Sequence, residues 1–368
     1  MKPSHRTENK ILNHSGTSRR GRGATANPAS RFDRITYVPD LDTAESEEDE
    51  KPSPITQFLK DTSRSIIATN DSPDIGFNAS INPYRGCEHG CVYCYARPTH
   101  EYLGFSAGLD FETKIMVKED APELLRRELS SPHWKPQVLG ISGVTDAYQP
   151  IERKLQITRR CLQVLAEFRN PVVIVTKNFL VTRDSDVLVE LARCQGAVVF
   201  ISVTTLQETL SRRMEPRASN PSRRLAALRA LSAAGIPTGV LVAPIIPGLN
   251  DHEIPAILSA AAKAGARNAG YTLLRLPYGL TDLFEQWLAQ HYPEKKEKVL
   301  NRIRSMRGGR LNDPRFFTRL KGEGKMAELL VSLFRAGCLK AGIDNRRITL
   351  SADSFRKPGP AQPSLFEL

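Results

Sequence analysis

Six short runs rich in β-branched residues recur along the middle of the chain, separated by amphipathic segments. Two of them, Val172–Thr176 and Val198–Val203, are apolar enough to be strands buried on both faces. The intervening segments, such as 152–169 and 221–234, repeat apolar residues at steps of three or four, as one face of a helix does. The expected strands are residues 79–83, 137–142, 172–176, 197–204, 238–243 and 269–275.

This alternation predicts an α/β fold in which parallel strands are joined by right-handed crossovers. Two architectures satisfy it: a partial barrel of six strand–helix units, open on one side, and a flat doubly wound sheet. The pattern alone does not choose between them. After residue 280, further apolar periodicity predicts helices that close one end of the core.

The 368 residues are enough for one large α/β domain with flanking segments. Six cysteines are too few for a disulfide scaffold, and there is no secretory signal and no apolar run of membrane-spanning length. These features predict a cytoplasmic protein with reduced thiols and no membrane partner. The expected divisions are a disordered basic and acidic arm over 1–55, a core over 56–280, a helical extension over 281–345 and a flexible tail over 346–368.

Three of the cysteines, Cys87, Cys91 and Cys94, fall within eight residues. A structural zinc site wants four ligands, and a cubane iron–sulfur cluster is usually held by four thiolates. Three thiolates would leave one iron of such a cluster open to another ligand. The alternatives are a zinc loop completed by His89 or His100, and a disulfide framework. The remaining cysteines follow apolar residues at helical steps, so we expect core packing for Cys161, Cys194 and Cys338.

Polar residues follow three of the expected strands. Thr145 and Asp146 come after the second strand, Lys177 after the third, and Ser202 and Thr204 end the fourth. Ligands of α/β folds bind at the carboxyl ends of the strands, and hydroxyl, ammonium and carboxylate groups together suit a zwitterionic amino acid. Turn formation and helix capping are the alternative roles of these residue types.

With an aromatic residue before its third cysteine (Tyr93), the CxxxCxxC loop resembles the cluster loop of the radical S-adenosylmethionine (SAM) enzymes. The order of motifs further resembles the branch that contains spore photoproduct lyase, and within it the uncharacterised bacterial PA0069 family. The resemblance covers roughly residues 56–340 and favours the partial (β/α)6 TIM-like barrel. It rests on the Gly21–Gly23 arm, Asn82–Tyr84, the cysteine loop, Thr145–Pro150, Ile174–Lys177, Ser202–Thr205 and Glu215–Arg217.

The resemblance implies that the three cysteines hold a [4Fe-4S] cluster whose fourth iron is chelated by SAM. One electron, from a donor such as flavodoxin or ferredoxin, would cleave SAM to a 5′-deoxyadenosyl radical that abstracts hydrogen from a substrate. Backbone near Tyr93 would meet the adenine, and Thr145 and Asp146 the amino group or ribose. Lys177 and Ser202 would bind the carboxylate, where an ammonium charge is strengthened by exclusion of water.

Arg217 would orient the cofactor or substrate, with a surface salt bridge as its alternative role, and Thr204 and Gln149 are weaker candidates. One departure from the pattern concerns the hydrogen donor. Spore photoproduct lyase uses a cysteine near the end of the second strand, whereas Ser142–Val144 contains none. The resemblance therefore does not extend to that repair reaction unless another donor, such as Tyr148, takes the role.

The net charge of +12 predicts affinity for nucleic acid, either DNA or RNA. Gln362–Phe366 resembles the short peptides with which bacterial repair proteins dock into the DNA sliding clamp, which favours DNA. Two functions follow: a radical SAM enzyme, or a non-enzymatic iron–sulfur protein associated with DNA or the clamp. Formation of 5′-deoxyadenosine favours the first, and salt-dependent DNA binding without turnover favours the second.

Overall fold

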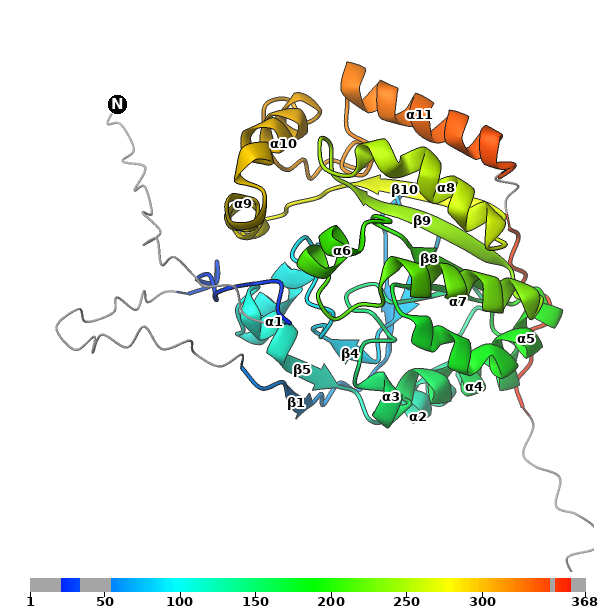
Figure 1. Ribbon diagram of the computed structural model, residues 1–368. Helices are drawn as coiled ribbons and strands as arrows, with labels where there is room; N and C mark the ends of the chain where they lie inside the picture. The colour runs from blue at the N-terminus through cyan, green and yellow to red at the C-terminus, as the bar shows by residue number, and fades with distance from the viewer. Residues whose placement is uncertain (1–20, 34–53, 345–347, 359–368) are drawn as a thin grey trace, which may run out of the picture.

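The computed structural model describes residues 21–33, 54–344 and 348–358 (Figure 1). Its main sheet has seven strands. Across the sheet the order is β10-β9-β8-β7-β6-β3-β2. The strands from β3 to β10 are parallel, and β2 joins antiparallel. All six predicted strands are confirmed: β3 Ala79–Ile81, β6 Leu139–Ile141, β7 Val172–Thr176, β8 Ala197–Ser202, β9 Thr238–Ile245 and β10 Asn268–Leu273, with β2 at Ile67–Thr69.

The strand order decides between the two predicted architectures. A doubly wound sheet reverses its order at a switch point, whereas every crossover from β3 to β10 steps to the next strand in the same direction. Right-handed crossovers of this kind place the connecting helices on one face of the sheet. Because β2 and β10 are edges that do not pair with each other, the sheet is the open partial barrel that the sequence predicts.

Helices pack against the outer face of this barrel (Figure 1). Ile174 and Ile201 point outward from β7 and β8 and share a buried core with Leu165 and Leu188. The helix predicted over 152–169 is two helices, because Gln156 takes a φ of 52° and interrupts it. The elements are α2 Ala121–Ser130, α3 Glu152–Leu155, α4 Ile157–Phe168, η2 Phe179–Asp184, α5 Ser185–Arg193, α6 Glu208–Met214, α7 Pro221–Ala233, η3 Asp251–Glu253 and α8 Ile254–Lys263.

Two aromatic rings fill part of the barrel beside glycines of β6 and β9. A Cβ atom on Gly140 would lie 2.4 Å from the ring of Phe77, and one on Gly239 would lie 2.3 Å from the ring of Phe200. Only glycine leaves room for the rings at these two positions. Because the rings occupy this space, a ligand has to bind toward the carboxyl ends of the strands.

A second, three-stranded sheet, which the sequence did not predict, flanks the cysteine loop. Its order is β1-β5-β4, with β1 and β5 parallel and β4 antiparallel to β5. The short β4 leads directly into the loop, so this sheet fixes where the loop begins. The elements are β1 Gln57–Lys60, β4 Tyr84–Arg85, η1 Arg97–Leu103, α1 Leu109–Thr113 and β5 Lys114–Val117.

The chain after the barrel forms three more helices, as expected: α9 Leu280–His291, α10 Pro293–Ser305 and α11 Lys325–Ala341. Of these, α11 lies along α8, where Gly337 faces Leu258 so closely that a Cβ atom would come within 2.7 Å of it. No helix in the described part of the chain is long and apolar enough to cross a membrane.

Two segments within the expected arm and tail, residues 21–33 and 348–358, lie against the domain. In the first, the Ala26 carbonyl accepts a hydrogen bond from Leu109 N at 3.3 Å. In the second, the amide of Arg356 donates to the carbonyl of Phe168 at 2.9 Å. The acidic run and the clamp-like peptide at 362–366 lie outside the described residues, and what was inferred from them stays a prediction.

Candidate active site

The cysteine loop, residues 86–96, joins β4 to η1. Its turns use glycines in the left-handed region, Gly86 with φ 80° and Gly90 with φ 68°. Backbone hydrogen bonds hold it on both sides: Cys87 N donates to the Phe111 carbonyl at 2.9 Å, and Val92 N to the carbonyl of Met214 at 3.0 Å. Two thiols, Cys87 and Cys91, are buried and Cys94 is partly exposed.

Burial raises the pKa of all three thiols in this loop. Nearby carboxylates raise the pKa further for two of them, Asp146 for Cys87 and Glu215 for Cys91. Metal-bound cysteine is a thiolate, and a buried thiolate needs a positive charge beside it. An iron centre bound by Cys87, Cys91 and Cys94 would supply that charge, so the loop fits the cluster that the sequence predicts.

The alternative of a single metal ion finds no support in the geometry. No three His, Cys, Asp or Glu side chains of the described chain are grouped as ligands of one ion. A cubane spreads its thiolates over different irons and does not need such a group. The two histidines have other partners, His89 contacting Asp146 at 3.4 Å and His100 the Lys114 carbonyl at 2.9 Å. The disulfide alternative is wrong for this structure, in which all six cysteines are free.

The other cysteines lie away from the loop. Cys161 and Cys338 are buried among apolar side chains, as predicted. Cys194 directly follows α5 as its C-cap residue and is partly exposed, so the prediction of core packing is wrong there.

Asp146 ties the end of β6 to β7 and to the cysteine loop. Its Oδ1 accepts hydrogen bonds from Tyr148 N at 2.9 Å and from Thr176 Oγ1 at 2.7 Å. Its Oδ2 accepts from Lys177 N at 2.9 Å and faces His89 Nδ1. Burial alone would raise the pKa of Asp146, but His89 and these hydrogen bonds outweigh it and hold the pKa at about 2. The carboxylate is therefore ionised and positions its neighbours.

Thr145 and Gln149 hold the first turn of the cysteine loop. Both donate to the carbonyl of Gly86, Thr145 Oγ1 at 2.6 Å and Gln149 Nε2 at 3.3 Å. The Gln149 Oε1 atom also accepts from Glu88 N at 2.9 Å. The polar residues after β6 are thus brought to the loop, as the sequence predicts.

Lys177 and Ser202 occupy adjacent positions at the ends of β7 and β8, since Thr176 pairs with Ile201 in the sheet register. The ammonium group of Lys177 donates to the Ala243 carbonyl at 3.2 Å. Burial, with a contribution from Arg224, lowers the pKa of Lys177 to about 8. A cation so deeply placed is suited to an anionic partner.

Glu215, which opens the Glu215–Arg217 motif, is a buried carboxylate whose contacts the sequence did not reveal. It accepts hydrogen bonds from the Tyr93 hydroxyl and from Thr204 Oγ1, the latter at 2.7 Å. Arg224, itself only 1% exposed, pairs with it, and the Lys177 ammonium lies 3.6 Å away. The predicted contacts Tyr93 and Thr204 are therefore linked through one carboxylate to the cation at the end of β7.

Arg217 contacts the cysteine loop from the other side. Its guanidinium pairs with Glu88 at 3.0 Å, and its backbone N donates to the carbonyl of His89 at 3.2 Å. Glu88 is only 3% exposed, so this ion pair is largely buried on the carboxylate side. The salt bridge expected as an alternative role is present, and it anchors the loop.

Comparison with known proteins identifies the family. Residues 81–261 match the family model of the radical SAM superfamily. An uncharacterised protein of Methanocaldococcus jannaschii is 30% identical over 222 residues, covering 60% of this chain and 79% of that protein. The chain belongs to the radical SAM superfamily. Members of this superfamily use a [4Fe-4S] cluster and SAM, and they require an electron donor.

A second relative and two solved structures also resemble this chain. An uncharacterised protein of Mycobacterium tuberculosis is 36% identical over 220 residues, 59% of this chain and 65% of that protein, so the match spans just under two thirds of it. A cysteine-to-serine mutant of spore photoproduct lyase has a TM-score of 0.57 at 18% identity, covering 77% of this chain and 79% of that one. Another mutant, with bound AdoMet and dinucleoside spore photoproduct, has a TM-score of 0.56 at 16% identity, covering 77% and 78%. This likeness shows the fold.

The side chain of Tyr148 is fully buried among the apolar side chains of the core. This burial does not favour the suggested role as a hydrogen donor at the strand ends. A different tyrosine lies at the end of β6. Tyr95, which follows the last cysteine, is 50% exposed and donates its hydroxyl to the Gly143 carbonyl at 2.9 Å.

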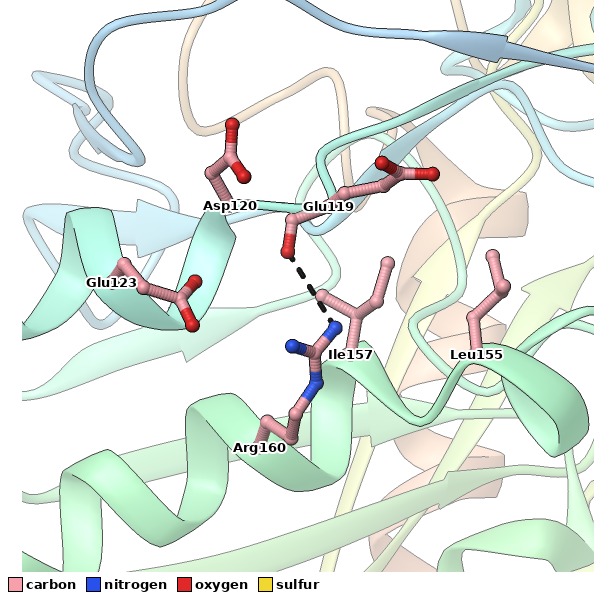
Figure 2. A pocket seen from close by; sticks show the side chains of 6 residues that line it. All are labelled: Glu119, Asp120, Glu123, Leu155, Ile157 and Arg160. Atoms are coloured by element: carbon pink, nitrogen blue, oxygen red, sulfur yellow. Dashed lines mark hydrogen bonds between the residues drawn. The ribbon is translucent and has the colours of Figure 1, made fainter.

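Two pockets lie outside the cysteine loop. One, of about 330 Å³, lies between the start of α2 and α4 (Figure 2), where Arg160 donates to the Glu119 carbonyl at 3.5 Å. None of its lining residues belongs to the loop or to the strand ends, and we assign it no function. The other, of about 370 Å³, lies beside η2 and is lined by Arg153, Asn178, Phe179, Leu180, Thr182, Arg183, Ser219 and Arg223.

The arginines of the second pocket differ in their pairing. Arg183 forms ion pairs with Glu152 and Asp184, both at 2.7 Å. Arg223 lies 3.6 Å from the centre of the Phe179 ring. Within the described ranges, no carboxylate comes within ion-pair distance of Arg153 or Arg223. The pocket therefore presents uncompensated positive charge just beyond the end of β7.

Proposed function

We propose that this protein binds a [4Fe-4S] cluster through Cys87, Cys91 and Cys94 and acts as a radical SAM enzyme. The observation that carries the proposal is the set of three thiols on one loop that faces polar side chains from three strand ends. When bound, the cluster and SAM supply a 5′-deoxyadenosyl radical that abstracts hydrogen from a substrate. Flavodoxin or ferredoxin is the proposed electron donor.

In this proposal Lys177 and Ser202 bind the cofactor carboxylate, because a largely buried ammonium and a hydroxyl at adjacent strand ends suit an anion. Thr145 and Asp146 face its amino group or ribose, and backbone near Tyr93 meets the adenine. Asp146 has a second task, since it also orients His89 and the backbone of Lys177 after β7.

Thr204 supports these contacts through Glu215, to which its hydroxyl is hydrogen-bonded. Arg217 holds the cysteine loop in place through Glu88. In this arrangement both residues position the cofactor site, and neither has to touch the cofactor itself.

We propose DNA as the substrate class. The net charge of +12 favours a polyanion, and the arginine-lined pocket beside η2 puts positive charge near the strand ends. A spore photoproduct lyase mutant of the same fold has been solved with a dinucleoside spore photoproduct. The missing cysteine after β6 argues for a different reaction from that of the lyase.

The test is anaerobic reconstitution followed by reduction in the presence of SAM. The wild type is expected to bind about four irons per chain and to release 5′-deoxyadenosine. Replacing all three loop cysteines with alanine should abolish both, whereas Cys194→Ala, at a partly exposed thiol outside the loop, should change neither. A fully loaded protein that makes no 5′-deoxyadenosine would refute the enzyme and favour a structural or redox cluster.

A further inference from the structure

An exposed group of aromatic side chains gathers around one arginine. The rings of Phe32, Tyr102 and Tyr278 are 52%, 71% and 66% exposed. The guanidinium of Arg31 lies 4.8, 5.0 and 3.9 Å from the centres of these rings, in the same order. We call these four residues the aromatic platform. It joins three chain segments that are far apart in sequence: the arm, η1 and the loop after β10.

Local structure holds the platform in place. A turn at Ser30–Asp33, closed by a hydrogen bond of 3.0 Å from Asp33 N to the Ser30 carbonyl, puts Phe32 near its tip. The Arg31 guanidinium is anchored by an ion pair of 3.0 Å to Glu101, which is 5% exposed on its side chain. The platform is thus built by specific contacts, and large apolar rings held exposed in this way mark an interaction surface.

Tyr278 has a backbone conformation that a bulky residue rarely adopts. Its φ of 53° lies in the left-handed region, which disfavours side chains with a Cβ. Non-glycine residues in such conformations cluster at binding and catalytic sites. The strain directs its ring to the Arg31 guanidinium rather than into the core.

The platform is connected to the end of the cysteine loop through the loop after β10. In the loop after β10, Arg275 lies 5.6 Å from the ring centre of Tyr95, the residue after the last cysteine. Tyr278 is three residues further along, so its Cα is at most about 11 Å from that of Arg275. The platform and Tyr95 are therefore linked through one short stretch of the loop after β10.

We propose that the aromatic platform stacks unpaired bases of single-stranded DNA and so holds the strand next to the cysteine loop; this rests on the proposed function. Exposed aromatic rings are the elements on which proteins stack bases, because every base has a flat apolar face. The positive charge of the chain attracts the phosphates. Because Arg31 is already paired with Glu101, the platform contributes through its rings more than through its charge.

The experiment measures fluorescence anisotropy of a labelled single-stranded DNA of about 16 nucleotides with the full-length, cluster-loaded protein at about 50 and about 200 mM salt. The variant Phe32→Ala/Tyr102→Ala should raise Kd at least about tenfold, since one stacked base is worth roughly 5- to 150-fold. Tyr278→Asn, which tolerates the left-handed backbone, should raise Kd about fivefold or more. The salt dependence of binding should not change, because the rings neutralise no phosphate.

Matched variants separate stacking from general loss of structure. Tyr102→Phe should bind DNA like the wild type, whereas Tyr102→Leu should lose affinity although it stays apolar. Leu339→Ala, at a side chain 84% exposed on α11, should have no effect. The double variant should still form 5′-deoxyadenosine without DNA, since neither ring contacts the loop cysteines.

The outcomes distinguish this inference from the proposed function. Ring variants that bind DNA as the wild type does would overturn the platform even if SAM is cleaved. A wild type that binds the matching RNA more tightly would overturn the assignment to DNA. If ring variants lose DNA while no protein forms 5′-deoxyadenosine, the platform stands and the proposed enzyme fails.

Discussion

Replacing Gly23 with alanine should detach the N-terminal arm from the cysteine loop. A Cβ atom on Gly23 would lie 1.8 Å from the carbonyl oxygen of Gly90 and 3.2 Å from Val92 N. Ordinary van der Waals contact begins near 3.4 Å, so the arm has to retreat by about 1.6 Å. Neither neighbour is a flexible side-chain end, because both atoms belong to the backbone of the cysteine loop.

That retreat breaks two hydrogen bonds to Glu112, a carboxylate with no exposed surface. Gly23 N and Ala24 N donate to its two oxygens at 3.0 and 2.8 Å, and a shift of 1.6 Å exceeds what either bond tolerates. Each bond to a charged acceptor is worth about 1.5–3 kcal/mol. Water reaching Glu112 recovers part of this, so we expect a loss of about 3 kcal/mol in the free energy of arm docking.

Hydrogen exchange of the amides of Gly23 and Ala24 measures this directly. A loss of about 3 kcal/mol corresponds to roughly 150-fold faster exchange. Gly76→Ala is the matched control, since its Cβ would meet nothing within 4 Å and its φ is not left-handed. The same exchange protection in Gly23→Ala as in the wild type would refute the reasoning.

Three further predictions address pH, cofactor and charge. Burial lowers the pKa of His100 from 6.5 to about 4, so between these pH values the unfolded chain binds more protons than the folded protein. The free energy of unfolding should therefore fall by up to about 3 kcal/mol as the pH drops from 7 to 4. In urea unfolding over this range, His100→Phe should make that fall smaller. Lys177→Gln should raise the SAM concentration for half-maximal 5′-deoxyadenosine formation about tenfold, with a smaller change for Lys177→Arg. In the double variant Arg153→Gln/Arg223→Gln, the affinity for single-stranded DNA should depend less steeply on salt, with the slope of log affinity against log salt smaller in magnitude by about 1.4. An unchanged slope would mean that neither arginine contacts phosphate.

The strands of the barrel were predictable because the composition of each strand alone indicates that it is buried. Val172–Thr176 and Ala197–Ser202 are continuous apolar runs, and strands buried on both faces require just that composition. The place of Asp146 and Lys177 followed from the same topology, because parallel strands bring their carboxyl ends to one edge. Their hydrogen bonding did not follow, since Thr176 and the loop histidine His89 are partners that only the folded chain brings together.

Buried arginines were the main features that the sequence did not reveal. Arg97 and Arg224 have almost no exposed surface, yet arginine in a helical segment normally predicts a solvated face. Their partners Glu112 and Glu215 lie on other elements, so no spacing along the chain announces the pairs. The contacts of the arm were unpredictable for a related reason: its backbone amides donate to Glu112, and no apolar periodicity marks such contacts in the sequence.

These two ion pairs brace the cysteine loop from opposite sides. Arg97 binds Glu112 at 2.5 Å and also donates to the Cys91 carbonyl at 2.9 Å, while Arg224 binds the Glu215 carboxylate that accepts the Tyr93 hydroxyl. Removing one partner of a buried ion pair costs about 3–5 kcal/mol of stability, so loss of either arginine should strongly destabilise the cysteine loop. Together the two pairs fix the backbone and one side chain of the loop, at the Cys91 carbonyl and at the Tyr93 hydroxyl, from two different helices.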